Sequence, residues 1–197
     1  MSNIFIISAP SGCGKTSLVK ELCYANTSVE QTISFTTRKM RQGEKNTKDY
    51  HFVSKDDFLN KIKLGHFIEY QAVYNNYYGT TYESIKEIND MGKDAILEID
   101  YKGMLSIKSV LPNAISIYIL PPNIKELEKR LLNRGQDEKE VIRRRISEAS
   151  HELKFSRFSD FTIINDEFKK ALSSLKSLIL LNKIEKHKEI VKLNMQF

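Results

Sequence analysis

The pattern of apolar and polar positions predicts strands and helices that alternate along most of the chain. Continuous apolar runs, which are typical of buried strands, occupy residues 4–8, 94–100, 114–120 and 161–165. Apolar residues at helical spacing, bounded by capping residues and glycines, indicate helices at residues 15–23, 80–92, 123–135, 137–155 and 168–193. Strands that alternate with helices favour a parallel α/β sheet.

Two of these helices carry more detailed expectations. Thr80, with Glu83 three residues later, forms a capping-box pattern at the start of the second helix. Met91 shares the helical spacing of that segment, so we expect it on the same apolar face. In the last helix, the spacing places Leu180 on or near the inner side.

Residues 31–80 interrupt the alternation of strands and helices. Apolar and polar residues alternate over 31–55, which predicts short strands that are largely antiparallel. Residues 54–65 then predict a short helix, with a cap at Ser54 and a stop at Gly65. Because strand-like composition returns after this helix, we expect the whole segment to be an inserted lobe.

Composition places the chain among ordinary globular domains. It has 197 residues, of which 41% are apolar and 28% charged. The start lacks the positive charge of a secretory signal, and no run approaches the roughly 20 apolar residues of a membrane span. Cys13 and Cys23 match no metal or redox spacing, so we expect a reducing compartment and a cytoplasmic protein. The net charge of +6 favours anionic partners, although a solvated basic surface explains it equally well.

A glycine-rich loop follows the first predicted strand and carries the clearest motif. Its residues are Ala9, Pro10, Ser11, Gly12, Cys13, Gly14, Lys15 and Thr16, which is the P-loop pattern with alanine at the usual first glycine. Gly12 and Gly14 allow the backbone to aim N–H groups inward, and the helix N-terminus behind them favours negative charge. Lys15 can reach the β- and γ-phosphates of a nucleoside triphosphate, and the Thr16 hydroxyl can bind Mg²⁺.

A P-loop does not name a reaction, so the acceptor must be found elsewhere in the chain. Arg38 and Arg41 are three residues apart and could converge on one phosphate group. Tyr50, Tyr77 and Tyr78 add hydroxyl groups nearby in the sequence. From the spacing alone, a solvated basic loop is an equally good interpretation.

The combination of motifs resembles the guanylate kinase family. The stretches "SAPSGCGKTSL", "SFTTRKMRQGE", "YNNYYGT", "ILEIDYKG" and "NRGQDEKEVIRRR" have the order and the intervals of that family. The resemblance covers the chain from about Asn3 to Lys186. It implies an α/β fold: a P-loop parallel sheet core flanked by helices, with an inserted mixed β/α GMP-binding lobe and a helical lid. The core would span about 1–32, 81–125 and 160–197, the lobe about 33–80 and the lid about 126–159.

The resemblance also implies which residues bind GMP. Ser34 and Glu69 would read guanine, because a carboxylate accepts hydrogen bonds from guanine N1–H and N2–H and repels the bare N1 of adenine. The family's other positions for binding GMP fall on Arg38, Arg41, Tyr50, Tyr78, Thr80, Glu98 and Asp100. Glu98 departs from the family, which has aspartate there, and so its role is open.

The remaining implied positions concern ATP and the transfer itself. Arg130, Arg134 and Arg145 match arginines that close over the triphosphate, and with Lys15 and Arg38 they make up the implied catalytic set. Asn165 matches a residue near the adenine of ATP. The implied reaction transfers the γ-phosphoryl group of ATP to GMP or dGMP with Mg²⁺ held by Thr16, phosphates and water. A non-catalytic binding module is the main alternative; we expect no nucleic acid or membrane partner, and a homo-oligomer is compatible with the sequence.

Overall fold

The central sheet of the protein is parallel, as the alternating pattern predicts. The computed structural model describes residues 2–73, 75–133 and 139–194. In this part of the chain, five strands pair in the order β2-β7-β1-β8-β9, all parallel. They are β1 (Ile4–Ser8), β2 (Val29–Gln31), β7 (Asp94–Glu98), β8 (Ile115–Leu120) and β9 (Phe161–Ile164). Strand β2 was not predicted, because three residues are too few to give an apolar run.

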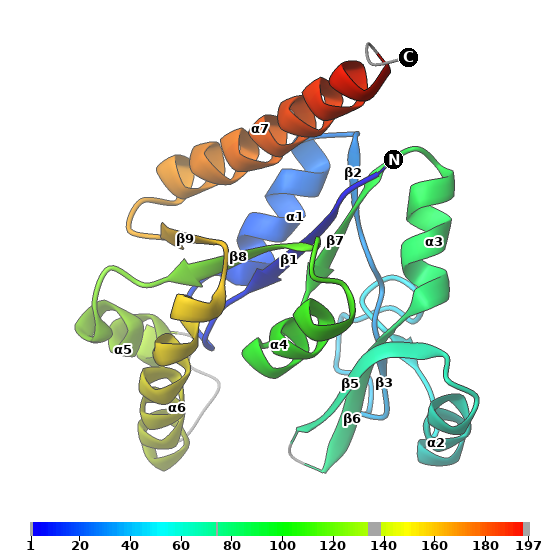
Figure 1. Cartoon of the computed structure of the whole chain (residues 1–197). Coiled ribbons are helices and arrows are strands. Elements are labelled where there is room, and N and C mark those ends of the chain that lie inside the picture. Colours follow the sequence, from blue (N-terminus) through cyan, green and yellow to red (C-terminus); the bar gives the residue numbers. More distant parts are fainter. Residues whose placement is uncertain (1, 74, 134–138, 195–197) are drawn as a thin grey trace.

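Helices cover both faces of this sheet, which explains why its inner strands β1, β7 and β8 are mostly apolar and buried. Phe5 and Ile7 of β1 pack on one face in a cluster with α1 (Lys15–Ala25) and α7 (Phe168–Asn194), while Ile6 packs on the other. That second face is covered by α3 (Tyr82–Asp90) and α4 (Tyr101–Val110). Figure 1 shows α7 running past α1 at one side and α4 on the opposite side.

A helical segment connects β8 to β9. It consists of α5 (Ile124–Asn133), α6 (Lys139–Glu152) and the short 3-10 helix η1 (Leu153–Phe158). Asn123 begins α5 by accepting a hydrogen bond from the backbone N–H of Glu126 at 2.8 Å, as predicted. The predicted cap of α6 at Asp137 lies outside the described residues.

The segment that interrupts the pattern forms a second sheet. Within the described residues it has the order β4-β3-β6-β5 and includes β3 (Phe35–Thr36), β4 (His51–Phe52), β5 (Phe67–Val73) and β6 (Asn76–Thr81). Strand β6 is antiparallel to both neighbours, whereas β3 and β4 are parallel, so the prediction of largely antiparallel pairing is only partly right. Helix α2 (Lys55–Lys63) packs on this sheet through Phe58, which stacks on Phe67 with 4.4 Å between ring centroids. The division into core, lobe and lid stays a prediction.

Three detailed expectations are wrong, each for a local reason. Helix α3 is capped by Thr81, whose side chain accepts from the Ser84 N–H, because β6 continues through Thr81 and the helix begins only at Tyr82. Met91 follows the end of α3 and is 61% exposed. Leu180 is 59% exposed, because the buried stripe of α7 passes through Ile179 instead.

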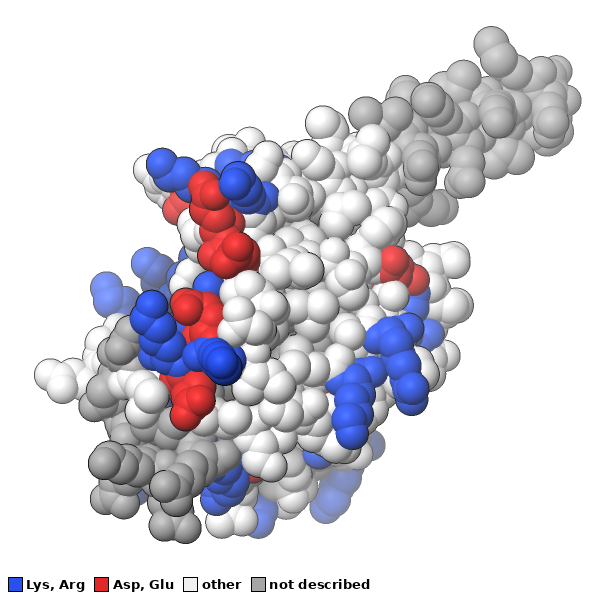
Figure 2. All heavy atoms as spheres, turned by 90° about the vertical axis from the view of Figure 1, so that its left-hand side faces the viewer, with Lys and Arg blue, Asp and Glu red and all other residues white. Residues whose placement is uncertain are grey.

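Charged side chains of both signs lie close together on the face formed by α5, α6 and β9. Figure 2, viewed from the side of α5, α6 and β9, shows basic and acidic side chains close together. Ion pairs between oppositely charged residues include Glu126 with Arg130 on α5 and Glu167 with Lys170 at the start of α7. On this face the two signs of charge are mixed, unlike a continuous basic stripe that binds nucleic acid. Among the described residues, no helix combines the length and the apolar character needed to cross a bilayer.

An ion pair connects α7 to the start of β7 in the central sheet. Asp94 at the start of β7 is 4% exposed and accepts from the backbone N–H of Asn3 at 2.7 Å. Lys183 of α7 places its Nζ 3.0 Å from Asp94 Oδ2 and donates to Ser28 Oγ at 2.8 Å. Because the carboxylate is buried, its charge depends on this lysine for compensation.

We expect Lys183→Ala to lower the free energy of unfolding by about 2 kcal/mol, because it leaves the buried carboxylate of Asp94 without its cation. Urea denaturation measures the change. The control is Lys86→Ala, which removes a pair with Asp90 in which both side chains are more than half exposed. Equal stabilities for the two variants would contradict this account of the α7 contact.

Candidate active site

The glycine-rich loop joins β1 to α1 and is shaped by two left-handed residues. Gly12 has φ 89° and Gly14 has φ 85°, a conformation that favours glycine. A Cβ on Gly14 would also lie only 2.5 Å from Asn165 Nδ2. The Asn165 amide in turn donates to the Cys13 carbonyl at 2.8 Å and is 5% exposed. The loop is therefore held from outside by a residue that follows β9.

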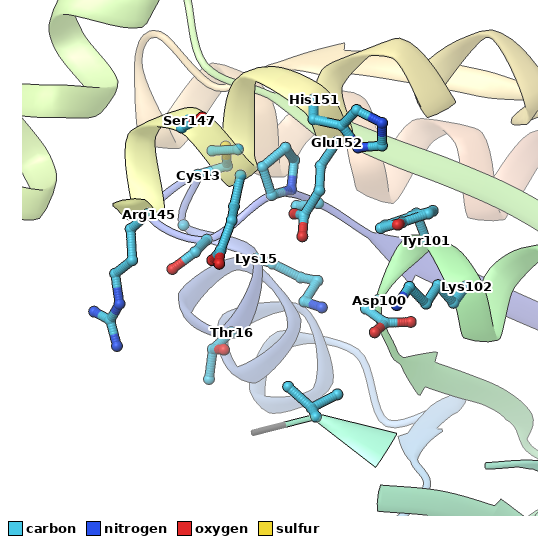
Figure 3. Close-up of a pocket in the computed structure, with 18 of the residues that line it drawn as sticks. Cys13, Lys15, Thr16, Asp100, Tyr101, Lys102, Arg145, Ser147, His151 and Glu152 are labelled. Carbon is cyan, nitrogen blue, oxygen red and sulfur yellow. The ribbon is translucent and has the colours of Figure 1, made fainter. Parts of the chain in front are cut away.

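A large cavity, here called the loop cavity, opens over this segment. Its volume is about 810 Å³, and its wall includes residues 9–17, Tyr50, residues 100–102, Arg145, His151 and Glu152. Figure 3 shows Arg145 and Glu152 reaching it from α6, on the side opposite Asp100. Backbone N–H groups at a helix N-terminus and a nearby lysine suit it to a polyphosphate.

Lys15 and Thr16 are both anchored on the carboxyl end of β7. Lys15 Nζ donates to the Ile99 carbonyl at 2.7 Å, and Thr16 Oγ1 donates to Glu98 Oε1 at 2.5 Å. Asp100 follows and caps α4 by accepting from the Gly103 N–H at 2.8 Å. This edge, outside the carboxyl ends of parallel strands, is where ligands bind in open α/β sheets.

The oxygen atoms at this edge fit Mg²⁺. The Thr16 hydroxyl and the Glu98 carboxylate provide the hard oxygen ligands that this ion prefers. Among the described residues, no three side chains of His, Cys, Asp or Glu are grouped to enclose a metal ion. Mg²⁺ at a nucleotide site needs no such cage, because one or two side chains, phosphates and water complete its coordination.

A second, smaller cavity adjoins the first and is here called the Glu69 cavity. Its volume is about 230 Å³, and its wall consists of Lys15, Ser34, Tyr50, Glu69, Gln71, Val73, Tyr78, Gly79, Glu98, Ile99 and Asp100. Glu69 is only 6% exposed, and burial raises the pKa of its carboxyl to about 7 against the opposing hydrogen bond from Thr80. Ser34 and Thr80 lie beside it with their hydroxyl oxygens 3.1 Å apart. The groups that shift the pKa of Glu69 include no cation. The cavity therefore ends in a buried carboxyl group.

The two arginines of the basic loop are placed differently. Arg38 forms a bidentate pair with Glu44, at 2.9 and 2.7 Å, and its guanidinium lies 5.5 Å from the ring centre of Tyr50. Tyr50 also contacts Tyr78 edge to face. The Arg41 side chain is exposed, and only its backbone N–H is seen to bind Glu44. The structure therefore brings Arg38, Tyr50 and Tyr78 together but does not bring Arg41 to them.

The arginines expected in the lid also separate into different places. Arg130 donates to the Asn165 carbonyl at 3.0 Å and to Glu126 at 3.2 Å, and with Asn165 it lines a third cavity of about 390 Å³ behind the loop. Arg145 lines the loop cavity. Arg134 lies outside the described residues.

Several side chains at the site were not anticipated from the sequence. Glu152 lines the loop cavity, and burial and the nearby charge of Asp100 raise its pKa to about 7. Gln31 donates to Glu98 at 3.0 Å. No motif marks either residue. Glu44 did leave a signal, since an acid three residues after Arg41 is the natural partner for one of the loop's arginines.

Comparison with known proteins agrees with this geometry. The sequence pattern of guanylate kinase matches residues 1–181. A guanylate kinase of Hydrogenovibrio crunogenus is 44% identical over 181 residues, which are 92% of this chain and 88% of that one. A guanylate kinase of Neisseria gonorrhoeae is 43% identical over 188 residues, or 95% and 92% of the two chains.

A solved structure gives the same result. The crystal structure of guanylate kinase from Anaplasma phagocytophilum superposes with a TM-score of 0.76 at 26% identity, covering 92% of this chain and 86% of that one. The fold, the phosphate loop, the sequence pattern and these relatives lead to one conclusion. The chain belongs to the guanylate kinase family.

Proposed function

We propose that the loop cavity binds ATP, that the Glu69 cavity binds GMP or dGMP, and that the phosphoryl group passes between them beside Lys15. Membership of the family makes the chain an ATP:GMP phosphotransferase. The observation that carries the assignment of the two cavities is that Lys15, Tyr50 and Asp100 line both of them. A phosphoryl group that moves from one cavity to the other must pass the residues that line both.

On the donor side, the loop would hold the β- and γ-phosphates in its backbone N–H groups. Lys15 would exchange its hydrogen bond with the Ile99 carbonyl for the phosphate oxygens. Thr16 and Glu98 are the residues that would hold Mg²⁺, which when bound offsets the negative charge of the phosphates. Arg145 and Arg130, and Arg134 as the resemblance implies, would add positive charge from the lid.

On the acceptor side, guanine would lie against Glu69, whose carboxylate accepts from the N1–H and N2–H groups. Ser34 and Thr80 would complete the hydrogen bonds to the base. Tyr50, Tyr78 and Arg38 would bind the phosphate, with Arg38 leaving Glu44 in exchange. Discrimination against adenine follows because the wrong base would leave the buried carboxylate unpaired.

The transfer itself needs no side chain as general base. The nucleophile is a phosphate oxygen whose second pKa is about 6 by analogy with phosphoamino acids, so it is largely ionised at neutral pH. Catalysis then consists of alignment, neutralisation of charge and exclusion of water, which would otherwise accept the phosphoryl group. We also propose a reducing, cytoplasmic location, which is supported by the free thiols of Cys13 and Cys23.

The experiment that tests this assignment is a coupled assay of ADP release with ATP, Mg²⁺ and one acceptor at a time: GMP, dGMP, AMP, CMP or dTMP. We expect turnover with GMP and weaker turnover with dGMP. In Glu69→Gln the preference for GMP over AMP should fall by about tenfold or more, because an amide cannot accept both guanine donors. Unchanged selectivity would mean that another residue reads the base, and a folded protein inactive with every acceptor would favour a binding module.

We expect Lys15→Ala to lower kcat by about 10²-fold or more, since it removes a charge that stabilises the moving phosphoryl group. The dissociation constant for GMP should change much less. Lys20→Ala is the matched control, because this lysine lies on the same helix with 67% of its side chain exposed. A Lys15 variant with near-normal kcat would contradict the role of the loop.

GMP binding should depend on pH through Glu69. Its pKa of about 7 in the free protein means that the carboxyl is largely protonated below pH 7 and must lose the proton to accept from guanine. Affinity should therefore fall by about tenfold from pH 8 to pH 6, measured by calorimetry in buffers of different ionisation enthalpy. The GMP phosphate also titrates in this range, so Glu69→Gln, which keeps only that contribution, is the control. Equal pH profiles would contradict the assignment.

A further inference from the structure

The Glu98 side chain makes two contacts at the carboxyl end of β7. Its Oε1 accepts from Thr16 Oγ1 at 2.5 Å, and its Oε2 accepts from Gln31 Nε2 at 3.0 Å. Each oxygen of the carboxylate therefore has its own donor. One donor lies on the phosphate loop helix, and the other lies at the end of the edge strand β2.

The register of the sheet explains how these residues meet. Gln31 is the last residue of β2 and is paired with Ile96 of β7. Glu98 comes two residues after Ile96, so both side chains point to the same face of the sheet. That is the face covered by α1, where Ile96 packs with Leu18, and Thr16 lies in the first turn of α1.

Thr16 and Glu98 line the two cavities described above, whereas Gln31 does not line either of them in the described part of the chain. Thr16 lines the loop cavity and Glu98 lines the Glu69 cavity. The Gln31 amide thus contacts Glu98 from outside these two cavities. Its route to a bound nucleotide or metal ion is the Glu98 carboxylate that it holds.

We propose that Gln31 is a positioning residue that fixes the Glu98 carboxylate against Thr16. This inference rests on the proposed function, because it concerns the same Mg²⁺-nucleotide site. A glutamate has one more rotatable bond than an aspartate, and the Gln31 hydrogen bond removes that freedom. The Thr16 hydroxyl then gives its hydrogen to Glu98 and keeps its lone pairs for the cation.

The expected size of the effect follows from the demands of Mg²⁺. This ion requires a nearly ideal octahedral arrangement of its ligands. A carboxylate that rotates out of this arrangement therefore weakens binding of the ion. Residues that orient metal ligands from outside typically change metal affinity by 10–100-fold when they are removed. Gln31 should therefore affect binding of the Mg²⁺ complex of a nucleotide while leaving the metal-free nucleotide nearly unaffected.

The first test measures ADP affinity by calorimetry, with Mg²⁺ and with EDTA, in the wild type, Gln31→Ala and Gln31→Leu. We expect both variants to bind Mg²⁺-ADP about tenfold more weakly and metal-free ADP within twofold of the wild type. Gln31→Leu keeps the volume of the side chain, so it yields the comparison even where Gln31→Ala is unstable. Glu30→Ala is the matched control, because the neighbouring residue on β2 pairs instead with Lys93 at 2.6 Å.

The second test combines Gln31→Ala with Glu98→Asp. If the amide acts only through the longer carboxylate, its removal should cost nothing further once that side chain is shortened, so the double variant should match Glu98→Asp within twofold. Additive losses would overturn the proposal, as would equal weakening of Mg²⁺-ADP and metal-free ADP. A wild-type protein without GMP-dependent turnover would instead contradict the proposed function, which keeps the two failures distinct.

Discussion

The hydrogen bond from Lys15 to the Ile99 carbonyl is the contact on which the arrangement of the site depends. It joins the phosphate loop to the end of β7 at 2.7 Å, across 84 residues of sequence. The parallel pairing of β1 with β7 makes it possible, because both strands deliver their carboxyl ends to the same edge. As a result, one lysine lies in the wall of both cavities, where the end of β7 holds it.

The sequence predicts the parts of this structure that rest on local patterns. The loop from Ala9 to Thr16 and most of the central strands need only apolar runs, glycines and caps, and the fold class is confirmed. The error at Thr80 shows the limit, because two adjacent threonines offer the same cap and only the end of β6 at Thr81 decides between them.

Contacts between distant segments could not be predicted in the same way. Asn165 reaches Cys13 across 152 residues, and Gln31 reaches Glu98 across 67. Neither pair carries a spacing that a sequence pattern could reveal. Likewise, the charge of the basic loop does not say that Arg38 turns toward Tyr50 while Arg41 remains exposed. The roles of the individual site residues stay predictions, although the structure gathers most of them at the two cavities.

The cations and acids of the site are balanced in a way that makes binding an exchange of partners. Arg38 is neutralised by Glu44, and the hydrogen bond from Arg38 in turn holds the pKa of the Glu44 carboxyl below its usual value. Glu69 and Glu152 have raised pKa values because burial disfavours their charged forms. Under the proposed assignment, each phosphate or base would replace an internal partner or remove a proton, so only the difference between the two interactions would contribute to affinity.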